Sequence, residues 1–219
     1  MNIFRQLTAK PWVATQAMID DFHVGGTFFL SPAKLGLRVL LSAITVLFAL
    51  LIFAYGMRME LEVWRPSPQM SLLWLNTVLL VLSSLAMQWA LFSARRHEID
   101  GVWIGLLASG FFAIAFLGGQ IMAWRQLNSL TAFNITNPAI GFFFLITALH
   151  GLHLLGGLVA LGRTTSKVWR GFDMAQVRLS VELCTTYWHY LLLVWLVLFG
   201  LLFSGNDSLG ILLSICGLR

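Results

Sequence analysis

Charged residues are scarce in this sequence. Lys, Arg, Asp and Glu make up 11% of the 219 residues, whereas 58% are hydrophobic, and the mean hydropathy is +0.83. Soluble domains carry roughly 25% charged residues, so this composition excludes a soluble domain and predicts an integral membrane protein. The net charge of +5 does not indicate nucleic-acid binding, because the basic residues stand in short loops between apolar runs.

Motifs for covalent chemistry are also missing. The two cysteines, Cys184 and Cys216, form no CxxC or Cys/His pattern, and their predicted places at opposite membrane faces exclude a mutual disulfide. The sequence has no GxSxG and no HExxH motif, which argues against the commonest hydrolase and zinc-protease sites. Residues 1–22 lack an apolar core followed by a small-residue cleavage site, so we expect the first helix to target the chain.

The sequence is rich, by contrast, in long apolar runs. Five of them are about 20 residues long, enough to cross roughly 30 Å of hydrocarbon. We therefore predict an all-α, polytopic membrane bundle of five transmembrane helices. Residues 1–34 would form a cytoplasmic segment, 35–204 the transmembrane domain and 205–219 a short external tail. The predicted helices are 38–57, 71–93, 102–124, 138–162 and 181–204.

The basic residues predict the orientation. When Lys and Arg are sorted by alternate loops, ten fall on one side of the membrane and four on the other. The positive-inside rule then places the N-terminus inside and the C-terminus outside. The inner set is Arg5, Lys10, Lys34, Arg38, Arg95, Arg96, Arg163, Lys167, Arg170 and Arg178, and the outer set is Arg58, Arg65, Arg125 and Arg219.

Small residues recur at four-residue spacing within the predicted helices. Such faces let two helices approach closely, so we expect them to form contacts within the bundle. The three ladders are Gly105, Ser109 and Ala113; Ala115, Gly119 and Ala123; and Gly156 with Ala160.

Polar residues inside the predicted helices are the candidates for function, because a polar group in hydrocarbon is costly unless it has a partner. Glu182, Thr186 and His189 follow the i, i+4, i+7 pattern of one helix face. We expect this face to turn toward His150 and His153 of the preceding helix. The full set is Asn76, Thr77, Ser83, Ser84, Gln88, Gln120, His150, His153, Glu182, Thr185, Thr186 and His189.

Four roles are open to the histidines. A metal site from His150, His153, His189 and Glu182 has suitable ligand types, but Glu182 lies nearer the inner surface. A haem is disfavoured because histidines at i, i+3 cannot straddle a macrocycle, and a proton relay because Glu182 is the only carboxylate in a predicted helix. We favour the fourth role, neutral imidazoles that are hydrogen-bonded between helices.

Four segments resemble subunit III of the haem-copper terminal oxidases, the cytochrome c and quinol oxidases. They fall in the expected helices, in the expected order, between Leu75 and Gly205. The combination of HGLH with YWH some thirty residues later is the most specific part. The segments are LNTVLLVLSS at 75–84, GLLASGFFAIAFLGGQ at 105–120, ALHGLHLLGG at 148–157 and VELCTTYWHYLLLVWLVLF at 181–199.

The resemblance implies a five-helix bacterial form of a subunit without catalytic residues, haem or copper of its own. Such a subunit binds structural phospholipid and stabilises its neighbours in the inner membrane. Haem and copper are then expected in the partners, subunit I and probably subunit II. The matching positions, with roles in helix packing or lipid binding, are Asn76, Gln120, His150, His153, Glu182, Trp188 and His189.

The chain departs from the family pattern at three buried acids. Thr45, Ala123 and Leu192 stand where the family commonly has a carboxylate, which puts any role of those acids in proton handling in doubt here. Two other functions are therefore weighed, an accessory subunit of a nitric oxide reductase and a small b-type cytochrome that uses the membrane histidines. A small transporter ranks last, because the sequence shows neither paired halves nor a helix broken at the membrane midplane.

Overall fold

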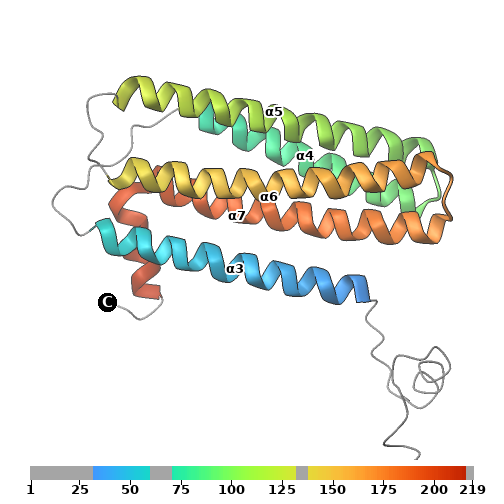
Figure 1. Ribbon diagram of the computed structural model, residues 1–219, viewed down its shortest axis with the longest axis horizontal. Helices are drawn as coiled ribbons and strands as arrows, with labels where there is room; N and C mark the ends of the chain where they lie inside the picture. The colour runs from blue at the N-terminus through green and yellow to red at the C-terminus, as the bar shows by residue number, and fades with distance from the viewer. Residues whose placement is uncertain (1–31, 60–70, 132–137, 216–219) are drawn as a thin grey trace, which may run out of the picture. The chain divides into compact units, whose positions relative to one another are not determined.

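Five helices make up the described part of the computed structural model, which covers residues 32–59, 71–131 and 138–215 (Figure 1). They are α3 (Pro32–Met59), α4 (Ser71–Arg95), α5 (Ile99–Thr131), α6 (Pro138–Trp169) and α7 (Met174–Ile215). All five are long and apolar enough to cross a membrane, so the predicted all-α fold with five spans is confirmed.

The helices extend beyond the predicted spans. Helix α7 begins at Met174 rather than 181 and continues to Ile215, through most of the segment predicted as a tail. The predicted N-terminal segment lies outside the described residues up to residue 31, as does Cys216. Hydropathy marks the hydrocarbon-spanning part of a helix, whereas the extra turns continue past it because helical hydrogen bonding does not stop at the membrane surface.

Two tight turns join neighbouring helices at one end of the bundle, which we call the short-turn end. In the first, His97 adopts φ 60°, and the Glu98 N–H donates to the Ser93 carbonyl at 3.0 Å. In the second, Gly171 adopts φ 66°, and the Phe172 N–H donates to the Lys167 carbonyl at 3.2 Å. This pattern, a left-handed residue after the helix and a 6→1 bond, is the Schellman motif that ends many helices.

At Gly105, helix α5 lies directly against the backbone of α4. A Cβ added there would lie 2.7 Å from Ala90 Cβ and 2.9 Å from the Ala86 carbonyl oxygen, so the absence of a side chain allows α4 and α5 to touch. Helix α7 packs on α4 and α6, and α6 also packs on α5. The first predicted small-residue ladder thus forms the α4–α5 contact, as expected.

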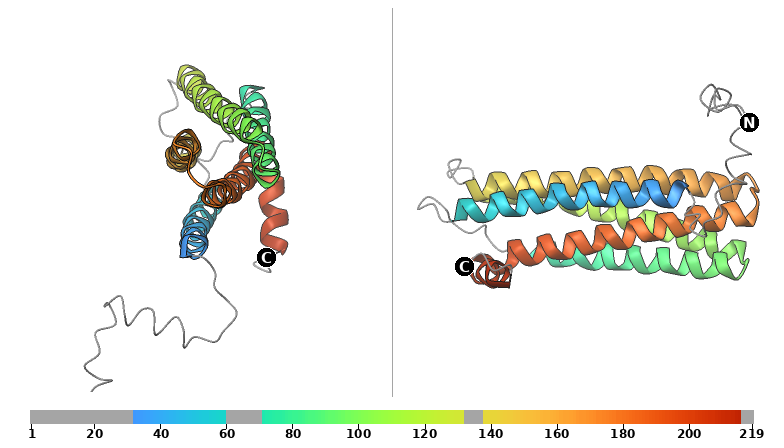
Figure 2. Two further views of the ribbon diagram at one scale, coloured as in Figure 1. Left: turned by 90° about the vertical axis from the view of Figure 1, so that its right-hand side faces the viewer. Right: turned by 90° about the horizontal axis from the view of Figure 1, so that it is seen from below.

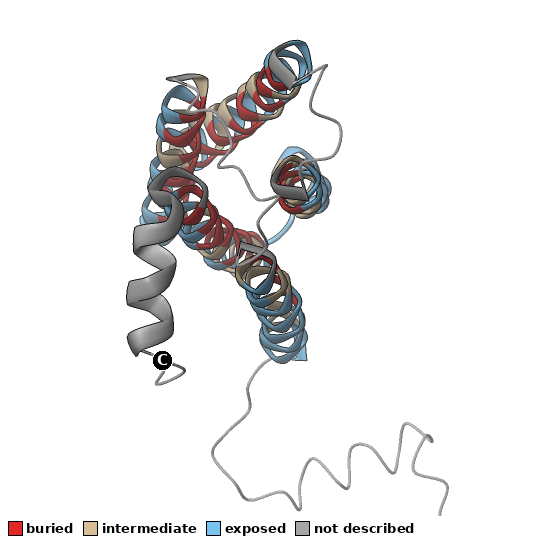
Figure 3. Ribbon diagram, turned by 90° about the vertical axis from the view of Figure 1, so that its left-hand side faces the viewer, coloured by how far each residue is buried: buried red, intermediate tan, exposed pale blue. Residues whose placement is uncertain are grey.

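Helix α3 contacts the other helices through side chains alone. From Gly36 onward, no Cα atom of α3 lies within 8 Å of another described helix, and only 11% of its most apolar window is buried. Figures 2 and 3 show this helix beside α7, with most of its surface exposed. The space between α3 and its neighbours is therefore not closed by backbone packing.

Candidate functional site

Two tryptophans of α7 donate hydrogen bonds to hydroxyls of α4. Trp188 Nε1 donates to Ser83 Oγ at 2.7 Å, and Trp195 Nε1 donates to Thr77 Oγ1 at 3.0 Å. Ser83 Oγ in turn donates to the Ser109 carbonyl of α5 at 2.8 Å. Because both indoles are buried, these bonds satisfy N–H groups that would otherwise be costly in an apolar interior.

The sequence reasoning named Trp188 but missed Trp195. The seven-residue spacing of the two tryptophans places them on one face of α7. Thr77 and Ser83, six residues apart on α4, form a matching pair of acceptors. The similar spacing of the two tryptophans and the two hydroxyl residues could have identified Trp195 from the sequence.

Asn76 and Gln120 join α4 to α5 deep in the bundle. Asn76 Nδ2 donates to Gln120 Oε1 at 3.3 Å, and both side chains are buried. Asn76 Oδ1 and Gln120 Nε2 have no hydrogen-bond partner in the described part of the chain. Gly119 leaves room for the Asn76 side chain, because a Cβ at that position would collide with it.

His150 is completely buried, at 0% exposure, and is surrounded by aromatic rings. The ring centroids of Trp195, Phe116 and Phe48 lie 5.1, 5.9 and 6.4 Å from its own. Neither imidazole nitrogen has a hydrogen-bond partner among the described residues. The prediction that His150 is hydrogen-bonded between helices is therefore wrong, and its observed contacts are with aromatic rings of α3, α5 and α7.

His153 lies one turn further along α6 and hydrogen-bonds within its own helix. Its Nδ1 lies 2.8 Å from the Leu149 carbonyl oxygen; since a carbonyl only accepts, Nδ1–H donates this bond. The Tyr187 hydroxyl of α7 donates to the His153 carbonyl at 2.9 Å. The tie between α6 and α7 thus runs through the backbone of His153 rather than through its imidazole.

His189 faces α4 and not the histidines of α6. Its Nδ1 lies 2.6 Å from Ser84 Oγ, and its Nε2 lies 3.0 Å from Gln88 Oε1. The expectation that the Glu182–Thr186–His189 face turns toward α6 is therefore wrong. Tyr187 occupies the side of α7 that meets α6, and His189, two residues on, is rotated about 200° from it.

The arrangement does not favour a metal or haem site. His150 is enclosed by rings, and both nitrogens of His189 are already engaged on α4. Glu182 is seven residues from His189 on α7, about two turns away. Within residues 32–59, 71–131 and 138–215, no three or more of His, Cys, Asp and Glu are grouped so that they could hold a metal ion.

The three positions at which the resemblance to subunit III implies an acid carry neutral side chains with defined surroundings. Thr45 Oγ1 donates to the Leu41 carbonyl at 2.8 Å, so the Tyr190 hydroxyl, also at 2.8 Å, donates to Thr45. Ala123 is completely buried, and Leu192 is partly buried against the core. The Thr45–Tyr190 bond is a direct tie between α3 and α7.

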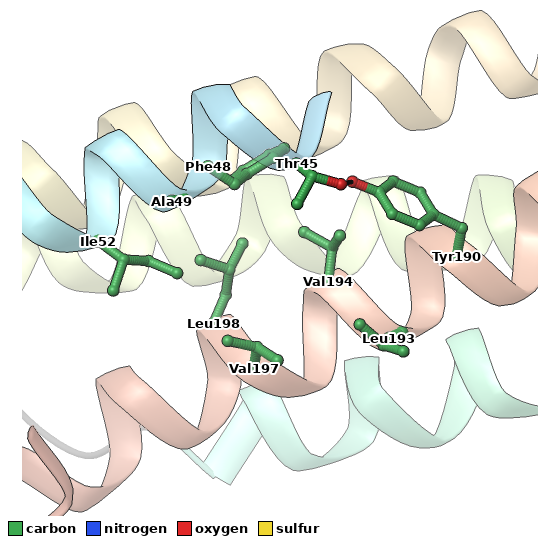
Figure 4. A pocket seen from close by; sticks show the side chains of 9 residues that line it. All are labelled: Thr45, Phe48, Ala49, Ile52, Tyr190, Leu193, Val194, Val197 and Leu198. Atoms are coloured by element: carbon green, nitrogen blue, oxygen red, sulfur yellow. Dashed lines mark hydrogen bonds between the residues drawn. The ribbon is translucent and has the colours of Figure 1, made fainter. Parts of the chain in front are cut away.

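Two grooves separate α3 from the bundle. The groove on the α6 side, which we call the α6 groove, has a volume of about 410 Å³ and is lined by Leu37 and Leu40, by Leu152, His153, Gly156 and Ala160, and by Leu183, Cys184 and Tyr187. The groove between α3 and α7, which we call the α7 groove, has about 160 Å³, and the Thr45–Tyr190 bond lies at one end of it (Figure 4). Both are lined almost entirely by apolar atoms.

Comparison with known families gives a match over most of the bundle. The model of the family described as "Cytochrome c oxidase subunit III" matches residues 62–205. The chain belongs to this family. The match contains all four segments on which the resemblance was based, and they lie in α4, α5, α6 and α7.

Named relatives agree with the family match. Cytochrome c oxidase subunit 3 of Thermostichus vulcanus is 29% identical over 203 residues, which are 86% of this chain and 93% of the relative. The protein of the same name from Synechocystis is 31% identical over 77% of this chain and 73% of the relative. A probable cytochrome c oxidase subunit 3 of Mycobacterium leprae is 33% identical over 64% and 70%. The chain is thus a multi-pass membrane protein of the terminal oxidase subunit III family.

Proposed function

We propose that this chain is the non-catalytic subunit III of a respiratory haem-copper terminal oxidase in a bacterial inner membrane, oriented with its N-terminus inside. It stabilises the catalytic subunit I, in contact with subunit I and probably subunit II. The proposal is supported by the family match across residues 62–205 and by relatives that are named as oxidase subunits. Haem and copper then reside in the partner subunits.

The interior of the bundle supports a structural rather than a catalytic role. Trp188 and Trp195 bond to α4, and Asn76 bonds to α5. His150 is closed off by rings. These side chains hold helices together, and none of them is placed where a reactant could approach.

Deleting the gene for this chain from its host and restoring it on a plasmid tests the structural role. We expect the deletion membranes to keep haem of the oxidase but to contain less assembled complex, and to lose oxygen consumption faster during turnover. Full activity and normal yield without the chain would contradict the proposal. Nitric oxide consumption measured on the same membranes separates an oxidase from a nitric oxide reductase.

We also propose that the α6 groove holds an acyl chain of a structural phospholipid. Its volume, about 410 Å³, lies in the range of ligand pockets, and its lining is apolar. Gly156 has no heavy atom within 4 Å of the place where a Cβ would stand, so the groove is open at this residue. In a bilayer such a space is filled by lipid, because water gains no hydrogen bonds there.

Lipid binding in the α6 groove can be tested by placing a larger side chain at one of its lining residues. Gly156→Leu should lower the number of phospholipids that remain bound to the purified complex, as counted by mass spectrometry of the extract. Gly162→Leu is the matched control, because Gly162 also lies on α6, also has nothing within 4 Å and is not part of the groove lining. Equal lipid content in both variants would contradict lipid binding in the α6 groove.

A further inference from the structure

Polar side chains lie on the outer surface of the bundle where α4 meets α7. His189 and Thr186 are exposed, and Gln88 is half-buried beside them. Exposed apolar side chains lie beside them, with Leu85 at 60% exposure on α4 and Leu196 at 46% on α7. We call these five residues the α4–α7 face. Because α4 and α7 run antiparallel, Leu85 and Leu196 each lie further from the short-turn end than their polar neighbours Gln88 and His189.

Hydrogen bonding within this face is incomplete. With the amide of Gln88 as placed, His189 Nε2–H donates to Gln88 Oε1, and the Ser84 hydroxyl donates to His189 Nδ1. The histidine is therefore fully satisfied as a neutral imidazole. The Gln88 NH₂ group has no acceptor among the described residues, and exchanging the amide oxygen and nitrogen would only leave the oxygen open instead.

The open amide lies within the apolar part of the membrane. Gln88 is seven residues from Arg95, the last residue of α4, which corresponds to roughly 10 Å along the helix axis. The hydrocarbon layer is about 30 Å thick, so neither water nor headgroups surround the amide, and acyl chains have no hydrogen-bonding groups. A primary amide left open at this depth is unfavourable, and such residues commonly mark helix–helix contacts.

We propose that the α4–α7 face is the docking surface for a transmembrane helix of the haem-bearing catalytic subunit. That helix presents a hydrogen-bonding group, a backbone carbonyl or a Ser, Thr or Asn side chain, to the Gln88 amide, while its apolar side chains pack on Leu85 and Leu196. The inference rests on the proposed function, which supplies this partner.

Two substitutions distinguish a role of Gln88 in partner docking from a role in holding His189 within this chain. Gln88→Leu removes the surface amide, and Ser84→Ala removes the other hydrogen bond to His189 from a buried position. We expect Gln88→Leu to reduce the amount of catalytic subunit that co-purifies by about three- to tenfold, which corresponds to one interhelical hydrogen bond with its packing. Ser84→Ala should retain the partner to within about twofold by the same measure. An equal loss in both variants would overturn the inference, since both would then act through His189 alone.

Crosslinking identifies the occupant directly. A photoreactive amino acid at Leu85 or Leu196 should form an adduct with the catalytic subunit in intact membranes, whereas one at Ile114 on α5, which is at least as exposed as either, should not. Adducts with lipid alone, or with a second copy of this chain, would overturn the inference. If only the Ile114 variant formed adducts with the catalytic subunit, the α4–α7 face would not be the docking surface, but the proposed function would stand. The absence of any haem protein from the purified complex would contradict the proposed function itself.

Discussion

Replacing Gly105 by alanine should force α4 and α5 apart. The new Cβ would lie 2.7 Å from Ala90 Cβ, 2.8 Å from the Ala90 nitrogen and 2.9 Å from the Ala86 carbonyl oxygen. Ordinary contacts of this kind begin near 3.4 Å, so the helices must separate locally by about 0.7 Å, the difference between 3.4 and 2.7 Å. Two of the three atoms belong to the backbone, which cannot rotate away as a flexible side chain could.

The expected cost of Gly105→Ala is about 1–3 kcal/mol, the usual range for overpacking a close contact. Gly118→Ala on the same helix is the control, because nothing lies within 4 Å of that position, and alanine there gains up to about 1 kcal/mol of helix propensity. Unfolding by titration with a denaturing detergent, followed by circular dichroism, gives both free energies. A Gly105→Ala variant as stable as Gly118→Ala would refute the close approach of α4 and α5.

Three further substitutions test single interactions. Ser83→Ala should lower the free energy of unfolding by about 1–3 kcal/mol, because it leaves the buried Trp188 N–H without an acceptor. The control is Ser42→Ala, which removes only a bond within its own exposed helix turn and should change the free energy of unfolding by less than about 0.5 kcal/mol. Equal effects of the two substitutions would argue against the hydrogen bond from the Trp188 indole. His97→Gly should stabilise the chain by about 1 kcal/mol in the same titration, because glycine adopts the observed φ 60° without strain; a loss of stability would contradict this turn. His150→Leu should be neutral within about 1 kcal/mol or stabilising, since no hydrogen bond is lost, and a fall in melting temperature of ten degrees would show that the imidazole has a partner.

Much of the fold could be predicted because length and hydropathy determine how a segment meets a membrane. The five apolar runs became five helices, and the four segments that resembled subunit III lie within the family match. In one of the two tight turns the left-handed residue is a glycine, Gly171, as is usual after a helix. The other turn has His97 in the same conformation, and a histidine does not signal a left-handed residue.

The candidate site could be predicted only in part, because the spacing of residues shows which of them share a face but not which helix that face meets. Glu182, Thr186 and His189 do share a face of α7, yet His189 bonds to α4. Rotation of a helix about its axis is determined by the packing of all its neighbours. The aromatic surroundings of His150 could not be predicted for the same reason, because the rings come from three other helices.

The central claim is that this chain supports a haem-bearing partner without binding haem itself. The most direct test is purification in mild detergent through a tag on this chain, followed by an absorption spectrum of the complex and of its separated subunits. The account predicts that a large haem protein co-purifies and that the Soret band stays with it after separation. A Soret band carried by this chain alone, or a colourless chain recovered alone at full yield, would contradict the account.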